Sequence, residues 1–268
     1  MIRDITVGQY YASDSAIHRL DPRVKILGTM AFVVMLFIIN DIYSYAFSIL
    51  ALALVIAISK VPSSFIFRGI KSILFIIFLT AILNVITTKG THILLQVGII
   101  KVTLEGVYMA IKMVVRLIML IIGSSLLTLT TTPIQLTDGI ESLLKPFRKI
   151  GVPSAEIAMM MSIALRFIPI LMEETDKIMK AQIARGADFE TGNIIQKAKN
   201  MIPLLVPLFI SAFRRANDLA MAMEARCYHG GDNRTQMKPL RYESRDYISY
   251  VVMWAYLGIA IIFRIVGI

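Results

Sequence analysis

The chain has 268 residues, 57 % of them hydrophobic, and a mean hydropathy of +0.71. One soluble domain of this size cannot bury so much apolar surface, so the composition predicts a membrane protein. The formal net charge of +10 fits basic cytoplasmic loops, and nucleic-acid binding is not expected because the basic residues form no run with interleaved aromatics. One cysteine and three scattered histidines predict no disulfide, no metal site and no cofactor.

The N-terminal part of the chain predicts several membrane helices and no removable signal peptide. The first apolar run begins only after Lys25, and no small-residue cleavage site follows it. This run, 24–39, and the next, 42–58, are separated by two polar residues, which predicts an antiparallel pair of helices. A basic connection leads to a third segment at 70–87. Residues 89–104 are too short to span and are expected to form a small hairpin or an interfacial loop.

The fourth apolar segment, 106–131, contains two basic residues, Lys112 and Arg116, one helical turn apart on the same face. Charged side chains are costly in lipid, so both are expected to face protein or to reach the interface. For Arg116 we favour an ion pair or a carbonyl contact that fixes helix packing over a role in transport. A fifth span is predicted at 247–262.

The region 133–246 differs in character from the apolar segments around it. It holds 13 of the 18 acidic residues and 16 of the 28 basic ones, in long amphipathic patterns that need water on at least one face. Helices are expected from Pro133 to about 149, from Ser154 with a kink at Pro169, and from about Ile194 to Gly230. The sequence thus predicts an all-α integral membrane protein in three parts: 1–132 with four transmembrane helices, 133–246 with cytoplasmic helices, and 247–268 with the last span.

Loop charge predicts the orientation of this architecture. The N-terminus, the connection at 60–71 and the 133–246 region carry most of the basic residues, which favours the cytoplasmic side for all three. With five spans, the C-terminus then lies outside the cell.

Two short phrases stand at the ends of the predicted helices of the 133–246 region. Ala184-Arg185-Gly186 and Ala225-Arg226-Cys227 each place an arginine between small residues, and the two arginines are 41 residues apart. A guanidinium on an open helix end can reach a groove on another protein and pair bidentately with a carboxylate. The repeated phrase therefore predicts docking rather than catalysis.

Two further observations concern packing and chemistry. Small residues four apart let two helices cross closely, and such a stripe is formed by Ala212, Ala216 and Ala220. The predicted spans contain no acid–base pair, no histidine and no Gly-rich phosphate loop, so the chain is not expected to be an enzyme.

These motifs resemble the transmembrane (T) component of energy-coupling factor transporters, which are ABC-type importers of vitamins and trace metal ions. The resemblance covers nearly the whole chain, and the paired arginine phrases are its most specific part. Cys227 departs from the glycine or other small residue that the family often has there. The remaining matching stretches are Gly8-Gln9-Tyr10, His18-Arg-Leu-Asp-Pro-Arg23 with Lys25, Thr132-Pro133 and Leu165-Arg-Phe-Ile-Pro169.

The resemblance implies a membrane anchor with a cytoplasmic coupling domain. Arg185 and Arg226 would dock into two ATP-binding cassette subunits, and the apolar faces of the coupling helices would hold a small substrate-binding membrane subunit. Methionines suit an adaptable surface of this kind, although core packing is their more frequent use. The residues concerned are Met159, Met160, Met161, Met221 and Met223. The chain itself would bind neither ATP nor the vitamin or ion.

Three alternatives to this function can be stated. The permease subunit of a conventional ABC importer would carry a single coupling loop, which two arginine phrases on one chain disfavour. A membrane-embedded enzyme is disfavoured because the spans lack an acid–base constellation. A dedicated cobalt or nickel system of the same family stays open, since its metal site would lie on another subunit.

Overall fold

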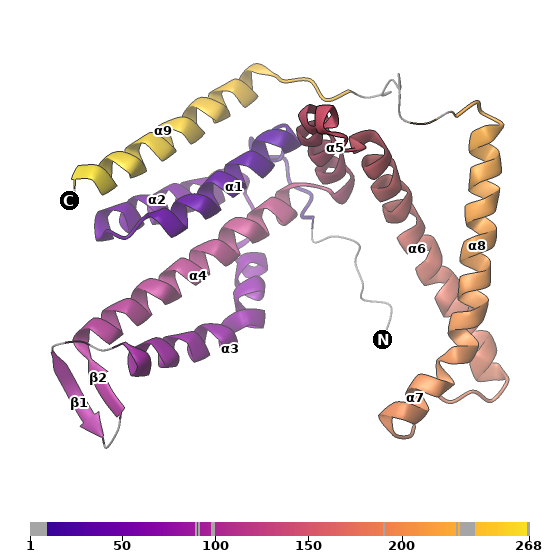
Figure 1. Cartoon of the computed structure of the whole chain (residues 1–268), viewed down its shortest axis with the longest axis horizontal. Helices are drawn as coiled ribbons and strands as arrows, with labels where there is room; N and C mark the ends of the chain where they lie inside the picture. The colour runs from indigo at the N-terminus through magenta and orange to yellow at the C-terminus, as the bar shows by residue number, and fades with distance from the viewer. Residues whose placement is uncertain are drawn as a thin grey trace. The chain divides into compact units, whose positions relative to one another are not determined.

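The computed structural model describes residues 10–88, 90, 92–97, 100–189, 191–228, 230 and 239–266. Its helices in chain order are α1 (Pro22–Ile38), α2 (Ile42–Ser59), α3 (Ser63–Thr87), α4 (Leu104–Thr130), α5 (Pro133–Leu144), α6 (Ser154–Ala184), α7 (Ile194–Asn200), α8 (Ile202–Glu224) and α9 (Ser244–Val266), with a short 3-10 helix η1 (Lys145–Ile150) after α5 (Figure 1). Two short antiparallel strands, β1 (Ile93–Val97) and β2 (Ile100–Thr103), connect α3 to α4. The all-α membrane fold is as predicted, and the hairpin expected within 89–104 is confirmed.

Local sequence signals explain where several helices begin. Asp21 caps α1, because its side chain accepts a hydrogen bond from the backbone N–H of Arg23, and Pro22 occupies the first helical position. Thr103 caps α4 in the same way through the N–H of Gly106. α6 begins at Ser154 as predicted and runs unbroken through Pro169. The predicted helix from Ile194 is instead two helices, α7 and α8, which meet at Met201.

The described chain divides into two compact units. Among the described residues, one unit contains 10–139 and 240–266, and the other lies within 140–239. The helical part of the second unit therefore falls inside the region 133–246 that the sequence sets apart. α5 begins in the first unit and ends in the second.

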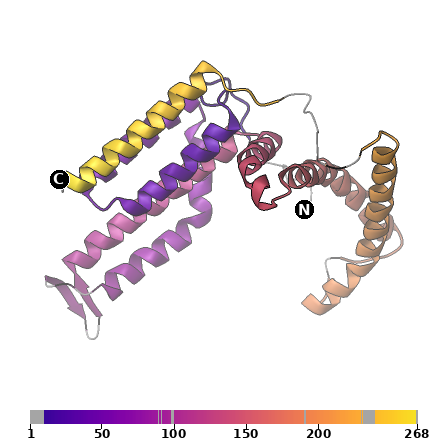
Figure 2. The same cartoon turned by 45° about the horizontal axis from the view of Figure 1, so that its top comes forward.

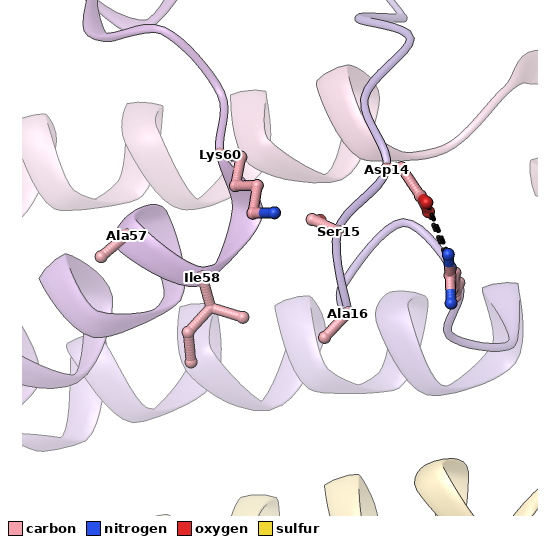
Figure 3. Close-up of a pocket in the computed structure, with 7 residues that line it drawn as sticks. Asp14, Ser15, Ala16, Ala57, Ile58 and Lys60 are labelled. Carbon is pink, nitrogen blue, oxygen red and sulfur yellow. Dashed lines mark hydrogen bonds and ion pairs between the residues drawn. The ribbon is translucent and has the colours of Figure 1, made fainter.

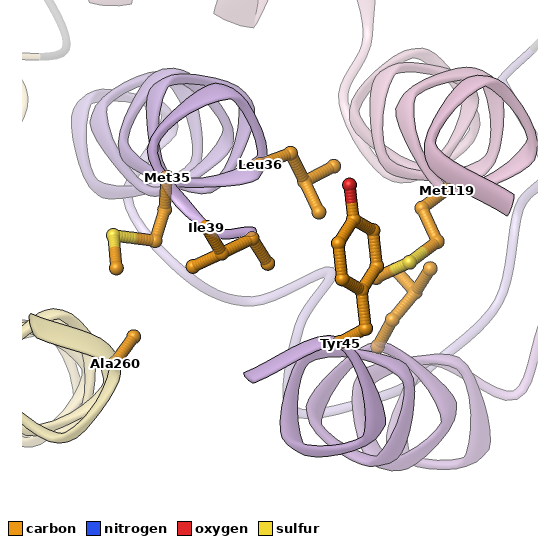
Figure 4. Packing of buried hydrophobic residues seen from close by; sticks show 7 residues of the cluster. Met35, Leu36, Ile39, Tyr45, Met119 and Ala260 are labelled. Carbon is orange, nitrogen blue, oxygen red and sulfur yellow. The ribbon is translucent and has the colours of Figure 1, made fainter. Parts of the chain in front are cut away.

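In the first unit, α1, α2, α4 and α9 lie side by side and α3 packs along α4 (Figures 1 and 2). The side chains of four helices converge on one apolar cluster, shown in Figure 4. Its buried members are Met35, Leu36 and Ile39 at the end of α1, Tyr45 and Leu52 in α2, Met119 in α4 and Ala260 in α9. A smaller cluster of Val61, Ile66 and Leu129 adjoins the first, since Ile56 and Ile122 pack against both.

Length and composition mark a slightly different set of spans from the predicted one. The helices α2, α4, α6 and α9 are long and apolar enough to cross a membrane, and α3 adds a fifth span if its two parts, which meet at 58°, count as one. α1 has 17 residues, which is short for a span, yet it packs against α4 and α9. The apolar first half of α6 explains why composition alone places it among the spans, so its place in a coupling region stays a prediction.

The second unit is built around α6 and α8, which pack against each other, with the short α7 joined to α8 (Figure 2). Gln182, near the end of α6, donates from its side-chain amide to the carbonyl of Pro203 at the start of α8 (3.2 Å). Further back, Arg215 of α8 forms an ion pair with Glu174 of α6 (3.0 Å). The end of α6 contacts the start of α8, and an earlier residue of α6 contacts a later residue of α8. The two helices are therefore antiparallel.

Candidate docking site at two helix ends

The first arginine phrase forms the C-terminal end of α6. The helix ends at Ala184, Arg185 is the C-cap residue, and Gly186 has a φ of 87° in the left-handed region. The N–H of Gly186 donates to the carbonyl of Ile183, and the N–H of Ala187 donates to that of Gln182. This pair of hydrogen bonds is a Schellman motif, which satisfies carbonyls that the helix leaves without partners.

The second phrase forms the end of α8 with the same geometry. Arg226 occupies the position equivalent to Arg185, and Cys227 has a φ of 58°, again left-handed. The N–H of Cys227 donates to the carbonyl of Glu224, and the N–H of Tyr228 donates to that of Met223. Each arginine is therefore followed directly by the left-handed residue of a Schellman motif, although the two sequences share only Ala-Arg.

The left-handed conformation gives a physical meaning to the small residue after each arginine. Glycine adopts positive φ without steric cost, whereas a residue with a Cβ atom does so unfavourably. The sequence shows Cys227 as a departure from glycine that is minor in size. The structure shows that backbone conformation, and not size alone, is what this position requires.

Both arginine side chains are open to solvent. Ala184, Arg185 and Gly186 are exposed, as are Ala225, Arg226 and Cys227, whose thiol is free. None of the ion pairs recorded among the described residues involves either arginine. α8 is 23 residues long, so at about 1.5 Å per residue its ends lie roughly 35 Å apart. Because Gln182 contacts the start of α8, the two arginines are presented at opposite ends of the pair.

The loop after Arg185 is held by its own hydrogen bonds. Asp188 accepts from the backbone N–H of Thr191 (3.2 Å), and the Asp188 carbonyl accepts from the side-chain amide of Asn200 in α7 (2.7 Å). The first tip therefore leads into an ordered turn. Around the second tip, His229 and residues 231–238 lie outside the described residues.

The other residues that the sequence singles out are divided between exposed and packed positions. Ala212 is half-buried, whereas Ala216 and Ala220 are exposed. α8 is paired with α6 through Arg215, and a close helix crossing at the stripe of Ala212, Ala216 and Ala220 stays a prediction. Met160 and Met221 are exposed, and Met159, Met161 and Met223 are half-buried. Contact of these residues with a partner stays a prediction.

A pocket of about 520 Å³ lies between the N-terminal segment and the last turn of α2 (Figure 3). Its polar residues include Asp14, Arg19 and Lys60. Asp14 and Arg19 form an exposed ion pair, and this hydrogen bond holds the pKa of Asp14 below its usual value. Since the acid and the base neutralise each other in water, nothing in this pocket indicates catalysis, and we assign no site to it.

Comparison with known proteins gives the class of this chain. A family model described as cobalt transport protein matches residues 13–237. A Thermosediminibacter oceani protein named energy-coupling factor transporter transmembrane protein EcfT is 59 % identical over 250 residues, which cover 93 % of this chain and 94 % of that protein. The proteins of the same name from Clostridium kluyveri (58 % over 266 residues, 99 % and 98 %) and Bacillus subtilis (45 % over 260 residues, 96 % and 98 %) are also similar.

These matches make the chain a membrane component of a transporter. More narrowly, it belongs to the EcfT/CbiQ-like family of transmembrane components of energy-coupling factor transporters.

Proposed function

We propose that this chain couples two ATP-binding cassette subunits to a small substrate-binding membrane subunit for the uptake of a vitamin or a trace metal ion. Arg185 docks in a groove on one ATPase and Arg226 in the equivalent groove on the other. The motion of the ATPases moves the helices that carry the two arginines, and these helices move the substrate-binding subunit. ATP hydrolysis takes place on the partners, and the chain itself is not catalytic.

The observation that carries this proposal is the repetition of one local structure around two exposed arginines. An arginine directly before a left-handed residue, together with the same Schellman hydrogen bonds, occurs at the ends of both α6 and α8. Two ATPases with similar grooves would each bind a similar arginine-bearing helix end. The ends of a 23-residue helix are far enough apart to reach separate subunits. A guanidinium with no recorded ion pair in the described part of the chain is available to a carboxylate of a partner.

The proposed orientation places both arginine tips in the cytoplasm, where the ATPases are. It is supported by the basic residues of the N-terminal segment, the α2–α3 connection and the 140–239 unit. The exposed apolar side chains of α8 support contact with a membrane partner, because an apolar surface of this kind needs cover. They include Leu205, Val206, Phe209, Ile210 and Phe213.

The test is co-purification of the wild-type chain and the Arg185→Ala/Arg226→Ala variant from host membranes in detergent. Removing one charged partner from a buried interface costs roughly 2–5 kcal/mol. We therefore expect two ATPases with the wild type and loss of both with the double variant. Arg214→Ala is the matched control, since Arg214 is exposed on α8 but away from the tip. Equal ATPase yield with the double variant and the wild type contradicts the proposal.

The native thiol tests the orientation without an added probe. Cys227 is the single cysteine of the chain and is exposed at the second tip. In sealed cells that express the chain without the ATPases, so that the tip is uncovered, this thiol is expected to resist a membrane-impermeant maleimide and to react once the membrane is opened. Gly186→Cys in a Cys227→Ser background should behave in the same way. Reaction of either thiol in sealed cells places the tips outside and overturns the orientation.

A further inference from the structure

The first turn of α1 contains a buried cation that holds the end of another helix. Lys25 is 8 % exposed, and its Nζ donates to the carbonyls of Thr130 (2.9 Å) and His18 (3.0 Å). Thr130 is the last residue of α4, and α5 begins at Pro133, three residues later. Lys25 therefore fastens the point at which the chain leaves the spans for the 140–239 unit.

The same turn of α1 is in contact with α5. A Cβ atom at Gly139 would lie 3.1 Å from Cβ of Pro22 and 3.0 Å from Cδ1 of Ile26. Such distances are tighter than most Cβ contacts, so the backbone of α5 lies close against α1 at Gly139. Gly139 is also the residue at which the chain leaves the first unit, since the second unit begins at Ile140.

A buried carboxylate connects the first turn of α1 to the point at which the chain returns. Asp246 is 2 % exposed, and one oxygen accepts from the backbone N–H of Asp21 (2.9 Å) while the other accepts from that of Glu243 (2.8 Å). Asp21 in turn binds Arg23, whose guanidinium lies 4.0 Å from the ring centroid of Tyr242. The residues just before α9 are thereby held against α1.

These contacts exceed what the capping of individual helices requires. A capping side chain needs only a backbone group of its own helix, yet Lys25 reaches a carbonyl 105 residues away and Asp246 an N–H 225 residues away. Both are buried charges, which are costly unless they are hydrogen-bonded. Both chain connections to the 140–239 unit, after Gly139 and before Leu240, are thus attached within a few residues to one helical turn.

We propose that residues 21–26 form a joint that passes motion of the 140–239 unit to the membrane helices, with Lys25 and Asp246 as its positioning residues. The inference rests on the proposed coupling function and adds the place at which the movement enters the spans. Because α1 packs against α4 and α9, a displacement of either connection reaches these helices through α1.

The experiment compares the response of the spans to MgATP in complexes co-purified with the ATPases and reconstituted in liposomes. Spin labels are placed at Asn40→Cys and Thr87→Cys in a Cys227→Ser background. Both positions are exposed and lie at helix ends remote from the joint. We expect MgATP to shift the distance between the labels in the unaltered joint. Lys25→Met, or Asp246→Asn, should reduce this shift at least fivefold while MgATP hydrolysis is retained.

Two further variants distinguish a joint from a merely structural role. Lys25→Arg keeps a cation with several donors and is expected to restore the shift. Lys112→Met removes another lysine of the spans, whose Nζ lies over the rings of Tyr45 and Tyr108, and should leave the shift unchanged. If the Lys25→Met chain does not assemble with the ATPases, the distance shift is compared between Asp246→Asn, where it should be reduced, and Lys25→Arg, where it should be retained.

A full shift in both Lys25→Met and Asp246→Asn, or no shift with the joint unaltered, overturns the joint while docking stands. Failure of the ATPases to co-purify with the wild type is a different result, which overturns the proposed function itself.

Discussion

Arg116 of α4 donates a hydrogen bond from Nε to the hydroxyl of Tyr45 in α2 (2.8 Å). A second nitrogen of its guanidinium donates to the carbonyl of Ile39, the C-cap residue of α1 (3.1 Å). The last carbonyls of a helix have no partner within it and are costly to leave unpaired away from water. A cation is also favourable at this negative end of the helix dipole. Arg116 thus fixes α1, α2 and α4 together, as the carbonyl contact favoured from the sequence implies.

We predict that Arg116→Met lowers the stability of the detergent-solubilised chain by about 1–3 kcal/mol, because it leaves the Ile39 carbonyl and the Tyr45 hydroxyl without this donor. Tyr45→Phe removes one of the two hydrogen bonds and should cost about 1 kcal/mol. Thermal unfolding of both single variants and of the double variant gives the coupling between the two side chains. Strictly additive losses would show that the Arg116–Tyr45 hydrogen bond contributes nothing.

Much of this architecture can be predicted from the hydrophobic periodicity of the sequence and from the residues that begin or end helices. Apolar runs interrupted at Asn40-Asp41 and at Pro133 predict where helices end, because turn residues and proline determine the backbone conformation of the residues next to them. The position of the arginine phrases at helix ends is predictable for the same reason. Local patterns also show their limit at Met201, where the predicted single helix divides into α7 and α8.

Contacts between distant segments account for what the sequence does not predict. Asp246 is the last residue of the region 133–246, and nothing near it in the sequence indicates a hydrogen-bond partner 225 residues away. The ion pair between Arg215 and Glu174 joins residues 41 positions apart, and the spacing of residues along α8 does not indicate this partner. Hydropathy also marks α6 as apolar without indicating what covers it.

The histidine of the N-terminal segment predicts a pH dependence. Nε2 of His18 lies 3.0 Å from the carbonyl of Tyr11, which can only accept, so Nε2 carries the proton and Nδ1 accepts from the hydroxyl of Ser15 (2.7 Å). Partial burial lowers the pKa of His18 from its usual 6.5, and nearby Lys25 lowers it further, against the opposing effects of the carbonyl hydrogen bonds and of Asp14.

The sign of the effect follows from proton linkage. Just below pH 6.5 the unfolded chain binds more protons than the folded one, so stability is complete above about pH 6.5 and falls as the pH drops through this value. His18→Gln cannot titrate and should flatten this part of the profile. The measurement is the unfolding midpoint in detergent between pH 5 and 8. Identical profiles for the two proteins would exclude His18 as the source.

The ion pair between Glu174 and Arg215 is predicted to set the pairing of α6 with α8 while contributing little stability. Its side chains are 25 % and 40 % exposed, and pairs of this kind contribute about 0–1 kcal/mol. Glu174→Arg places two cations together and should increase amide hydrogen exchange in both helices. The exchanged pair Glu174→Arg/Arg215→Glu should restore protection. Failure of the exchanged pair to recover protection would argue against direct contact between the two side chains.

The last prediction concerns the left-handed residue after Arg226. The left-handed conformation costs a residue with a Cβ atom about 1–2 kcal/mol, and the greater freedom of glycine in the unfolded chain offsets about 0.5–1 kcal/mol of this. Cys227→Gly is therefore expected to stabilise the end of α8 by roughly 0.5–1 kcal/mol and to slow amide exchange at the Cys227 and Tyr228 N–H groups that close its cap. Gly186→Ala, the reverse change at the end of α6, should accelerate exchange at Gly186 and Ala187. Because neither change removes an arginine, both variants should still bind ATPases, with the better-capped tip binding at least as well. Faster exchange in Cys227→Gly would mean that the thiol side chain stabilises this helix end by more than the backbone strain costs.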